Sequence, residues 1–276
     1  MTDRYAVMGH PIAHSRSPRI HALFAAQTGQ DMSYEAVDVE PGHFPQAVAE
    51  FRGAGGRGLN VTVPYKQQAW NLSERRSERA QRAGAVNTLV LDPAELFGDN
   101  TDGAGLVRDL TGNHGLALDG RRVLLVGAGG AARGVLEPLL AQGPRRLVIA
   151  NRTPGRAVEL AGAFRGLGPV EGCGFADLQD RRFDLIINAT AAGLAGEVPP
   201  LPGHVAAEGA WCYDMMYGAG PTAFVAWARE HGVAHAVDGL GMLVEQAAES
   251  FRLWRGVEPD TAPVIETLRS ELRREA

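Results

Sequence analysis

Lys66 and Asp102 are the residues whose types and positions suit proton transfer. Lys66 closes the strand-like run NVTVPYK, which Pro64 interrupts, so the lysine stands where the next helix should begin. Asp102 follows a turn and precedes an apolar helix, as either a catalytic carboxylate or the N-cap of that helix. An isolated lysine is usually a surface residue, so the proton-transfer interpretation requires the two residues to meet.

Hydroxyl and amide side chains in the same half of the chain could bind a polar substrate. In the run MGHPIAHSRSP, Ser17 stands before Pro18, where it suits the N-cap of a helix, whereas Ser15 has no such structural role. Asn87 lies within the apolar run GAVNTLVL, where an unpaired buried amide would cost about 1–3 kcal/mol. We therefore expect Asn87 to bind either a loop backbone group or a ligand.

A glycine-rich turn, VGAGGAARG, follows the strand-like run RVLLV and opens a helical pattern. Gly127 permits a tight turn, Gly129 lets a pyrophosphate approach the backbone, and Ala132 lets the helix pack closely on the strand. A glycine triplet alone is weak evidence. Its position between a strand and a helix predicts a dinucleotide-binding site.

The end of the next strand distinguishes the two nicotinamide cofactors. NAD sites usually carry an acidic residue there, which binds the ribose hydroxyls. Here the strand RLVIA is followed by Asn151, Arg152 and Thr153 and then by Arg156, with no carboxylate before Glu159. Arginine suits a 2′-phosphate, so the sequence favours NADP, the alternative being a pair of solvent-exposed loop arginines.

Strand-like and helix-like runs alternate along the chain, which predicts an α/β protein. The apolar runs after residue 121 are expected to form strands at 122–127, 146–151, 183–190 and 210–217. The helical patterns between them lie at 131–142, 156–164 and 221–232. This alternation predicts a doubly wound parallel sheet covered on both faces. In the N-terminal part we expect strands at 4–9, 32–39, 57–63 and 85–91, and helices at 18–27, 44–51 and 74–82.

A long helix is expected after residue 239, because apolar residues recur there on one helical face. They are Leu240, Leu243, Val244, Ala247, Ala248, Phe251 and Trp254. The doubly wound alternation is complete by then, so this helix and the final run APVIETLRSELRRE are expected to return to the first domain. The predicted division is a discontinuous substrate-binding domain, 1–101 plus 240–276, and an inserted dinucleotide-binding domain, 102–239.

The composition is that of a globular protein and argues against nucleic acid as a partner. Hydrophobic residues make up 45% of the 276 residues and charged residues 21%, so the chain can bury two cores. The net charge of −5 disfavours binding to phosphate backbones. The basic run RRSERAQR is interrupted by Glu78, and we interpret it as a solvated helix face.

Cysteines and histidines predict neither a disulfide framework nor a metal site. The two cysteines, Cys173 and Cys212, fit a reducing compartment. His10, His14 and His21 have no cysteine or carboxylate set at ligand spacing beside them. The run MTDRYAVMGHP lacks the pattern of a signal sequence, and no apolar run approaches the ~20 residues of a membrane span. We therefore expect a cytoplasmic protein with no membrane partner.

The chain resembles the shikimate dehydrogenase family in the order and spacing of its motifs. These are GHPIAHSRSP, NVTVPYK, GAVNT, GDNTDG, GAGGAARG, NRT, NAT, DMMY and DGLGMLVEQAA. The resemblance runs from Tyr5 to beyond Trp254, with a departure at YGAGPTAF, where the family more often has Thr-Pro before the Phe. It implies an N-terminal α/β substrate domain completed by C-terminal helices, a Rossmann-like NADP-binding domain, and NADPH-dependent reduction of 3-dehydroshikimate to shikimate on the pathway to aromatic amino acids.

Carried over by motif, the resemblance assigns roles to residues of both domains. Ser15 and Ser17 would bind the substrate carboxylate, and Lys66 would be the acid/base residue with Asp102 as its partner. The other ring contacts would come from Thr62, Asn87, Asp102, Tyr217 and Gln246. The cofactor would bind Gly127, Ala128, Gly129, Gly130, Ala131, Asn151, Arg152, Thr153, Arg156, Thr190, Met215 and Gly239.

Two alternatives stay open at this point, and so does the choice between a monomer and a homodimer. A quinate/shikimate dehydrogenase with relaxed substrate or cofactor use is disfavoured by Arg152 and by the serine pair Ser15 and Ser17. A non-catalytic NADP-dependent sensor with the same two domains is disfavoured by Lys66 and Asp102, because a sensor needs no acid/base pair.

Overall fold

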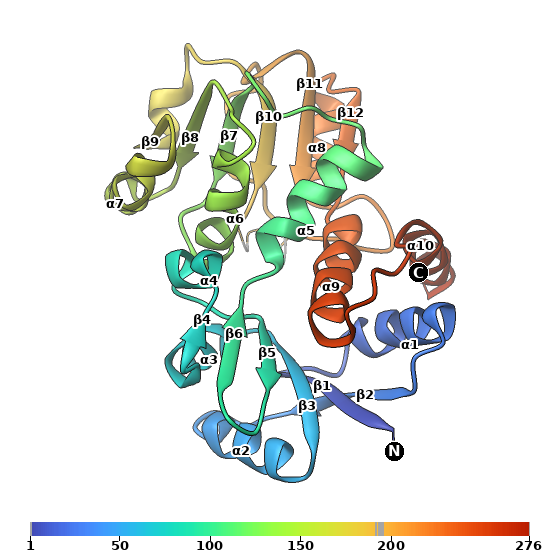
Figure 1. Ribbon diagram of the computed structural model, residues 1–276. Coiled ribbons are helices and arrows are strands. Elements are labelled where there is room, and N and C mark those ends of the chain that lie inside the picture. The colour runs from blue at the N-terminus through green and yellow to red at the C-terminus, as the bar shows by residue number, and fades with distance from the viewer. Residues whose placement is uncertain (1, 191, 193–195, 276) are drawn as a thin grey trace. The chain divides into compact units, whose positions relative to one another are not determined.

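Each of the two units of the chain is built around its own six-stranded sheet (Figure 1). The computed structural model describes residues 2–190, 192 and 196–275. The first unit comprises Met1–Gly105 and Leu243–Glu266, and the second comprises Leu106–Met242 and Thr267–Ala276. Helices cover both sheets, so the predicted α/β class is confirmed.

The boundaries differ from the predicted division, because the first unit extends to Gly105, residues 240–242 group with the second unit, and the C-terminal helix is divided between the two. The division 1–101 plus 240–276 assigns this whole helix, α10 (Ala262–Glu275), to the first unit, whereas residues from Thr267 onward group with the second. One contact that ties them there is the ion pair between Arg269 Nη1 and Asp238 Oδ2, at 2.7 Å. A charge pair between residues 31 apart leaves no signal in the apolar periodicity.

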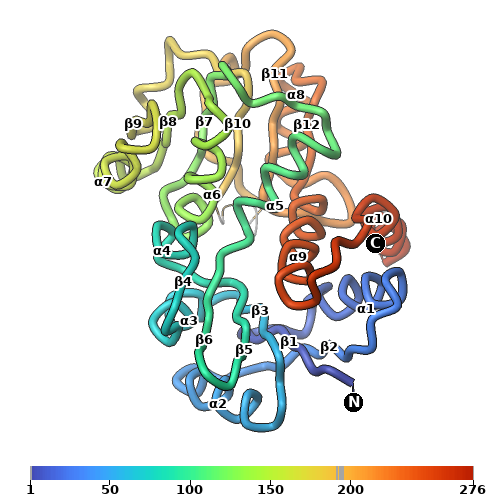
Figure 2. Tube along the Cα trace, viewed as in Figure 1, coloured from blue at the N-terminus to red at the C-terminus, as the bar shows by residue number. Residues whose placement is uncertain are grey.

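The first unit has a mixed sheet with the strand order β2-β1-β3-β5-β6-β4. Its strands are β1 (Asp3–Gly9), β2 (Met32–Asp38), β3 (Gly56–Val61), β4 (Arg75–Arg76), β5 (Thr88–Leu91) and β6 (Leu96–Asp99). Strand β5 runs antiparallel to both β3 and β6, while the other pairs are parallel. Figure 2 shows the β5–β6 hairpin, whose turn is held by a hydrogen bond from the Ala94 N–H to the Asp92 carboxylate, at 2.8 Å.

Four helices and the first residues of a fifth accompany this sheet, together with parts of α9 and α10. They are α1 (Ser17–Thr28), α2 (Phe44–Gly53), α3 (Lys66–Leu72), α4 (Glu78–Ala83) and the start of α5 (Asp102–Arg108). The helix expected at 74–82 begins only at Glu78, because Ser77 caps it by accepting a hydrogen bond from the Ala80 N–H, at 3.2 Å. Residues 75–76 form β4 instead, and the sequence analysis predicted neither β4 nor β6.

The second unit has an all-parallel sheet with the strand order β12-β11-β10-β7-β8-β9, visible from edge to edge in Figure 1. Its strands are β7 (Arg122–Val126), β8 (Arg146–Ala150), β9 (Val170–Cys173), β10 (Phe183–Asn188), β11 (Ala206–Asp214) and β12 (His235–Val237). The order reverses between β7 and β10, as it does in dinucleotide-binding folds. Four of these strands match predicted ones, whereas the short edge strands β9 and β12 were not predicted.

Alternating side chains of the second sheet enter two separate cores. Val123 and Leu125 of β7 belong to one cluster, and Leu124 and Val126 belong to the other. The helices of this unit are α6 (Gly130–Leu140), α7 (Pro154–Phe164) and α8 (Ala223–Glu230), with a π-helical turn at Asp109–Asn113 and 3-10 turns at Arg165–Leu167 and Phe175–Leu178. Both faces of the sheet are therefore buried, which explains the continuous apolar runs in its central strands, such as Val123–Val126 and Leu147–Ala150.

Helix α9 (Leu240–Arg255) forms where the apolar periodicity predicts it. Val244, Ala247 and Phe251 on its predicted apolar face are fully buried. None of the helices in the described ranges combines the length and the apolar character that a membrane crossing requires.

Candidate active site

Lys66 and Asp102 meet within the first unit. Each is the first residue of a helix, Lys66 of α3 and Asp102 of α5. The Lys66 Nζ lies 2.5 Å from Asp102 Oδ2, and the two side chains are 33% and 14% exposed. The ammonium is thus partly open to solvent, while the carboxylate lies deeper. The N-cap interpretation of Asp102 is wrong, because Asp102 lies inside the helix and its carboxylate binds side chains.

The amide of Asn87 holds the second oxygen of this carboxylate. Asn87 Nδ2 donates to Asp102 Oδ1 at 2.8 Å, and Asn87 Oδ1 accepts from the Thr101 N–H at 2.8 Å. The backbone donor fixes which end of the amide points at Asp102. Asn87 is only 3% exposed and its partners are side chains as well as backbone, so the expectation of a loop backbone partner is met only in part.

Gln246 of α9 completes this cluster. Its Oε1 lies 3.2 Å from Asn87 Nδ2, and its Nε2 donates to the Leu243 carbonyl at 2.9 Å. A Cβ at Gly105 would lie 2.6 Å from the Gln246 nitrogen, so the glycine of the motif DGAG permits the close approach of α5 and α9.

Ser15 and Thr62 lie in loops that follow β1 and β3, and Ser17 is the first residue of α1. Helix α1 begins at Ser17 itself with Arg16 as its N-cap residue, so the expectation that Ser17 caps the helix is wrong. Ser15 does have a structural role, because its Oγ accepts the Ser17 N–H at 3.3 Å. Thr62 is half-buried, and its N–H donates to the Met8 carbonyl at 3.0 Å.

The glycine turn of the second unit has the shape that a pyrophosphate requires. Gly127 has a φ of 108°, and a Cβ there would lie 3.1 Å from the Ala189 carbonyl oxygen. Gly129 and Gly130 at the start of α6 would each have open space around a Cβ, and Ala132 is fully buried. The start of α6 is therefore exposed at the switch point of the sheet, beside Ala128 and the exposed Ala131.

The residues after β8 suit a ribose that carries a 2′-phosphate. Asn151 Nδ2 donates to the Thr153 carbonyl at 3.0 Å, which closes the turn before α7. Arg152 and Arg156 are both exposed, and within the described ranges neither guanidinium forms an ion pair. Two uncompensated cations beside a dinucleotide turn suit a 2′-phosphate.

The remaining predicted residues belong to the second unit. Thr190 Oγ1 donates to Asn188 Oδ1 at 2.8 Å, and the Met215 N–H donates to the Asn188 carbonyl at 3.0 Å. A Cβ at Gly239 would lie 2.5 Å from the Met215 carbonyl oxygen, so a glycine is needed there. Tyr217 is half-buried in the segment after β11, and its expected contact with the substrate stays a prediction.

Comparison with known proteins identifies the family. Models of the shikimate dehydrogenase substrate binding domain, the shikimate / quinate 5-dehydrogenase and the shikimate 5′-dehydrogenase C-terminal domain match residues 7–89, 110–195 and 239–269. The shikimate dehydrogenases (NADP(+)) of Methylococcus capsulatus and Alkalilimnicola ehrlichii are each 62% identical to the chain over 98% of its length, and the matches cover 98% and 100% of those proteins. The chain belongs to the shikimate dehydrogenase family. The predicted family and its class, an oxidoreductase acting on a CH-OH group, are confirmed.

Solved structures agree with this assignment. Shikimate 5-dehydrogenase from Thermus thermophilus, in complex with NADP(H) and shikimate, is 36% identical with a TM-score of 0.87, covering 98% of this chain and 100% of that chain. An Ael1 enzyme from Pseudomonas putida is 46% identical with a TM-score of 0.91, covering 97% and 98%. A ligand-free 5-ketofructose reductase from Gluconobacter is 26% identical with a TM-score of 0.86, covering 98% and 99%, so the fold of this family also serves a differently named reductase.

The sequence did not lead us to predict a buried hydrogen-bond network that contacts Thr190 and Met215, two of the expected cofactor residues of this shikimate dehydrogenase family member. Asp214, at the end of β11, accepts hydrogen bonds from Asn188 Nδ2 at 3.0 Å and from Thr222 Oγ1 at 2.6 Å. Burial raises the pKa of Asp214, although these donors oppose the shift. Asn188 in turn binds Thr190, so the network fixes the ends of β10 and β11. Polar residues at the ends of two apolar strands were the available signal.

Groups of three or more potential metal ligands are absent from the described part of the chain. Two polar residues that were not predicted as site residues, Asn100 and Thr101, lie beside the Lys66–Asp102 pair. Asn100 Oδ1 accepts the Asp102 N–H at 3.1 Å, and Thr101 Oγ1 lies 2.9 Å from Asn87 Nδ2. Both belong to the motif GDNTDG, whose buried polar residues could have indicated this role.

Proposed function

We propose that the protein is an NADP-dependent shikimate dehydrogenase, which reversibly reduces 3-dehydroshikimate to shikimate in the biosynthesis of aromatic amino acids by way of chorismate. The observation that carries this proposal is the Lys66–Asp102 pair oriented by Asn87, in a chain 62% identical to proteins named for this activity. A sensor without catalysis would have no use for a partly exposed ammonium held on a buried carboxylate.

In this proposal the first unit binds the substrate. The hydroxyls of Ser15 and Ser17 bind its carboxylate, which suits side chains at the open start of a helix. Thr62, Asn87, Tyr217 and Gln246 bind the ring hydroxyls. The hydroxyl of Thr62 has no protein partner in the described residues, which leaves it available to a ligand.

Lys66 moves the proton. NADPH, when bound, supplies the hydride that the carbonyl carbon receives. Lys66 Nζ then donates a proton to the carbonyl oxygen, and in the reverse direction the free amine accepts the proton of the ring hydroxyl. Asp102 binds Lys66 Nζ with one carboxylate oxygen and Asn87 Nδ2 with the other, so it holds the ammonium in one position. Positioned proton transfer of this kind contributes roughly 10²–10⁴-fold in rate.

The second unit binds the cofactor in this proposal. The pyrophosphate lies at the N-terminus of α6 against Gly129 and Gly130, where the backbone is open. Arg152 and Arg156 bind the 2′-phosphate, which accounts for the preference for NADP. Met215 and Gly239, together with Thr190, form the remainder of the proposed cofactor contacts.

The test is an absorbance assay at the NADPH band with shikimate or quinate and with NADP+ or NAD+. We expect turnover with shikimate and NADP+, and at most weak turnover with the other three combinations. Comparable turnover of quinate would support the alternative quinate/shikimate dehydrogenase, because one matched family model covers both substrates. Cofactor binding without turnover of either substrate would support the sensor.

We further propose that the protein works in the cytoplasm as a monomer or a homodimer, with no nucleic acid or membrane partner. The net charge of −5 and the two buried, unpaired cysteines support this proposal. Light scattering after size-exclusion chromatography distinguishes a mass of one chain from that of two.

A further inference from the structure

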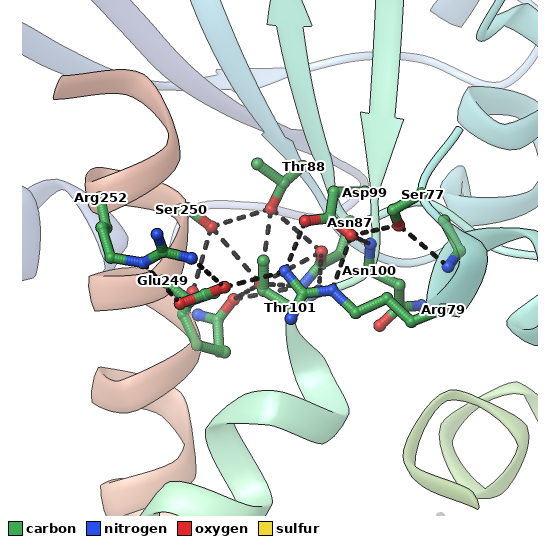
Figure 3. Close-up of polar contacts among 12 residues, drawn as sticks. Ser77, Arg79, Asn87, Thr88, Asp99, Asn100, Thr101, Glu249, Ser250 and Arg252 are labelled. Atoms are coloured by element: carbon green, nitrogen blue, oxygen red, sulfur yellow. Dashed lines mark hydrogen bonds and ion pairs between the residues drawn. The ribbon is translucent and has the colours of Figure 1, made fainter. Parts of the chain in front are cut away.

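Arg79 lies in the run RRSERAQR, and the interpretation of this run as a solvated helix face is wrong at that residue. The side chain is 25% exposed and reaches two carboxylates, those of Asp99 and Glu249 (Figure 3). Arg79 Nε donates to Asp99 Oδ1 at 2.7 Å, and Nη2 donates to Asp99 Oδ2 and to Glu249 Oε1, the latter at 3.0 Å. The guanidinium therefore bridges residues that are 150 positions apart in the sequence.

The two carboxylates belong to the two elements that carry proposed substrate residues. Asp99 ends β6, and its carboxylate also accepts the Asn100 N–H at 2.7 Å. The Asn100 side chain in turn accepts the N–H of Asp102 at 3.1 Å, so three successive hydrogen bonds link Arg79 to the backbone of the catalytic residue Asp102. Glu249 lies on α9, three residues after Gln246, and therefore on the same side of that helix.

Each carboxylate is deeply buried, with 3% exposure for Asp99 and 4% for Glu249. Glu249 has a second cation, because Arg252 Nη2 donates to its Oε1 at 2.8 Å. For Asp99 the structure gives no other cation in the described residues, only the Ser77 hydroxyl and the Asn100 N–H. Burial lowers the pKa of Arg79, and the hydrogen bonds and charges of Asp99 and Glu249 reverse this and raise it above its ordinary value.

We propose that Arg79 is a positioning residue for catalysis, which fixes the β6–α5 corner bearing Asp102 and the α9 helix bearing Gln246 relative to each other. This inference rests on the proposed function. A planar guanidinium can hold Asp99 through two nitrogens and still reach Glu249, whereas an ammonium has one nitrogen and cannot reproduce the two-nitrogen contact with Asp99. Displacing a catalytic group by ~1 Å can cost about 10²-fold in rate, so a small shift of the corner should be measurable.

The test compares Arg79→Lys with a matched control, Arg122→Lys. Arg122 forms a similar two-nitrogen ion pair with Asp184, at 2.6 Å and 3.1 Å, but belongs to the second unit and is not one of the proposed substrate or cofactor residues. Both variants and the wild type are assayed at 15 °C with shikimate and NADP+, and circular dichroism verifies that each is folded. If Arg79→Lys does not fold, Asp99→Asn, which keeps the side-chain size, replaces it under the same criteria.

We expect Arg79→Lys to lower kcat/KM for shikimate by about tenfold or more while the KM for NADP+ stays within about twofold of wild type. Arg122→Lys should lose comparable thermal stability and keep both kinetic constants. The inference is overturned if Arg79→Lys loses stability with unchanged shikimate kinetics, or if its KM values for shikimate and for NADP+ rise together. An inactive wild type would instead overturn the proposed function itself.

Discussion

His21 gives the first unit a predictable sensitivity to acid. The imidazole is fully buried, and neither ring nitrogen has a hydrogen-bond partner among the described residues. Its ring stacks on Tyr34 with 4.1 Å between the ring centroids, and Phe24 and Trp254 lie around it. An imidazolium in these surroundings would be a charge without water or a counter-ion. Burial accordingly lowers the pKa of His21 from 6.5 to about 3.

The sign and size of the effect follow from proton linkage. The unfolded chain binds a proton at His21 below about pH 6.5, whereas the folded chain binds it only near pH 3, so the free energy of unfolding falls as the pH drops between these values. The full shift corresponds to about 5 kcal/mol. At pH 4.5 the loss attributable to His21 should be about 3 kcal/mol, a large part of the stability of an ordinary domain.

The assay is urea unfolding of the wild type and of His21→Phe between pH 7.5 and pH 4.5. Phenylalanine keeps an aromatic ring at the site and does not titrate. Other acid-sensitive groups act in both proteins, so the difference between the two unfolding free energies isolates the histidine. We expect this difference to change by about 3 kcal/mol in favour of His21→Phe as the pH falls. A difference that stays constant across this range would refute the reasoning.

Three further predictions concern the proposed ligands. Replacing Arg152 and Arg156 by Ala should raise the KM for NADP+ by about tenfold or more and hardly change the KM for NAD+, because each charge-assisted bond to a 2′-phosphate contributes about 1.5–3 kcal/mol. Equal increases in KM for both cofactors would exclude this role. Ser15→Ala should raise the KM for shikimate. It should also lower the free energy of unfolding, measured by urea denaturation, by about 1 kcal/mol, because Ser15 Oγ accepts the N–H of Ser17. Unchanged shikimate kinetics would remove Ser15 from the carboxylate site. Gly239→Ala should weaken NADP+ binding in a fluorescence titration, because its Cβ would lie 2.5 Å from the Met215 carbonyl oxygen; unaltered affinity would show that this segment does not contact the cofactor.

Local patterns predicted much of the fold and part of the site. Apolar runs and a glycine turn were enough to locate β7, α6 and β8, because a parallel strand buried on both faces is apolar at every position. The motif residues Lys66 and Asp102 were expected to meet, and they do so at 2.5 Å. The short strands β4, β6, β9 and β12 were missed, because a run of two to four residues carries little periodicity.

Ion pairs between distant residues could not be predicted in this way. Arg79 and Glu249 are 170 positions apart, and a charged residue in a basic run is usually solvated. The N-terminus of α1 was also misjudged, because the helix begins one residue earlier than expected, with Arg16 as its N-cap residue and with the Ser17 N–H bound to Ser15 Oγ. Such choices depend on tertiary contacts that no local pattern contains.

The most direct test of the account is the double-mutant cycle of Lys66 and Asp102, measured as turnover of shikimate with saturating NADP+. We predict that Lys66→Ala lowers kcat by at least ~10²-fold while the affinity for NADP+, measured by fluorescence titration, stays near wild type. Because Asp102 acts by orienting the lysine, the double variant should be hardly slower than the slower single variant. Additive losses would show that the two residues act independently, and near-normal turnover of Lys66→Ala would contradict the assignment of Lys66 as the proton carrier.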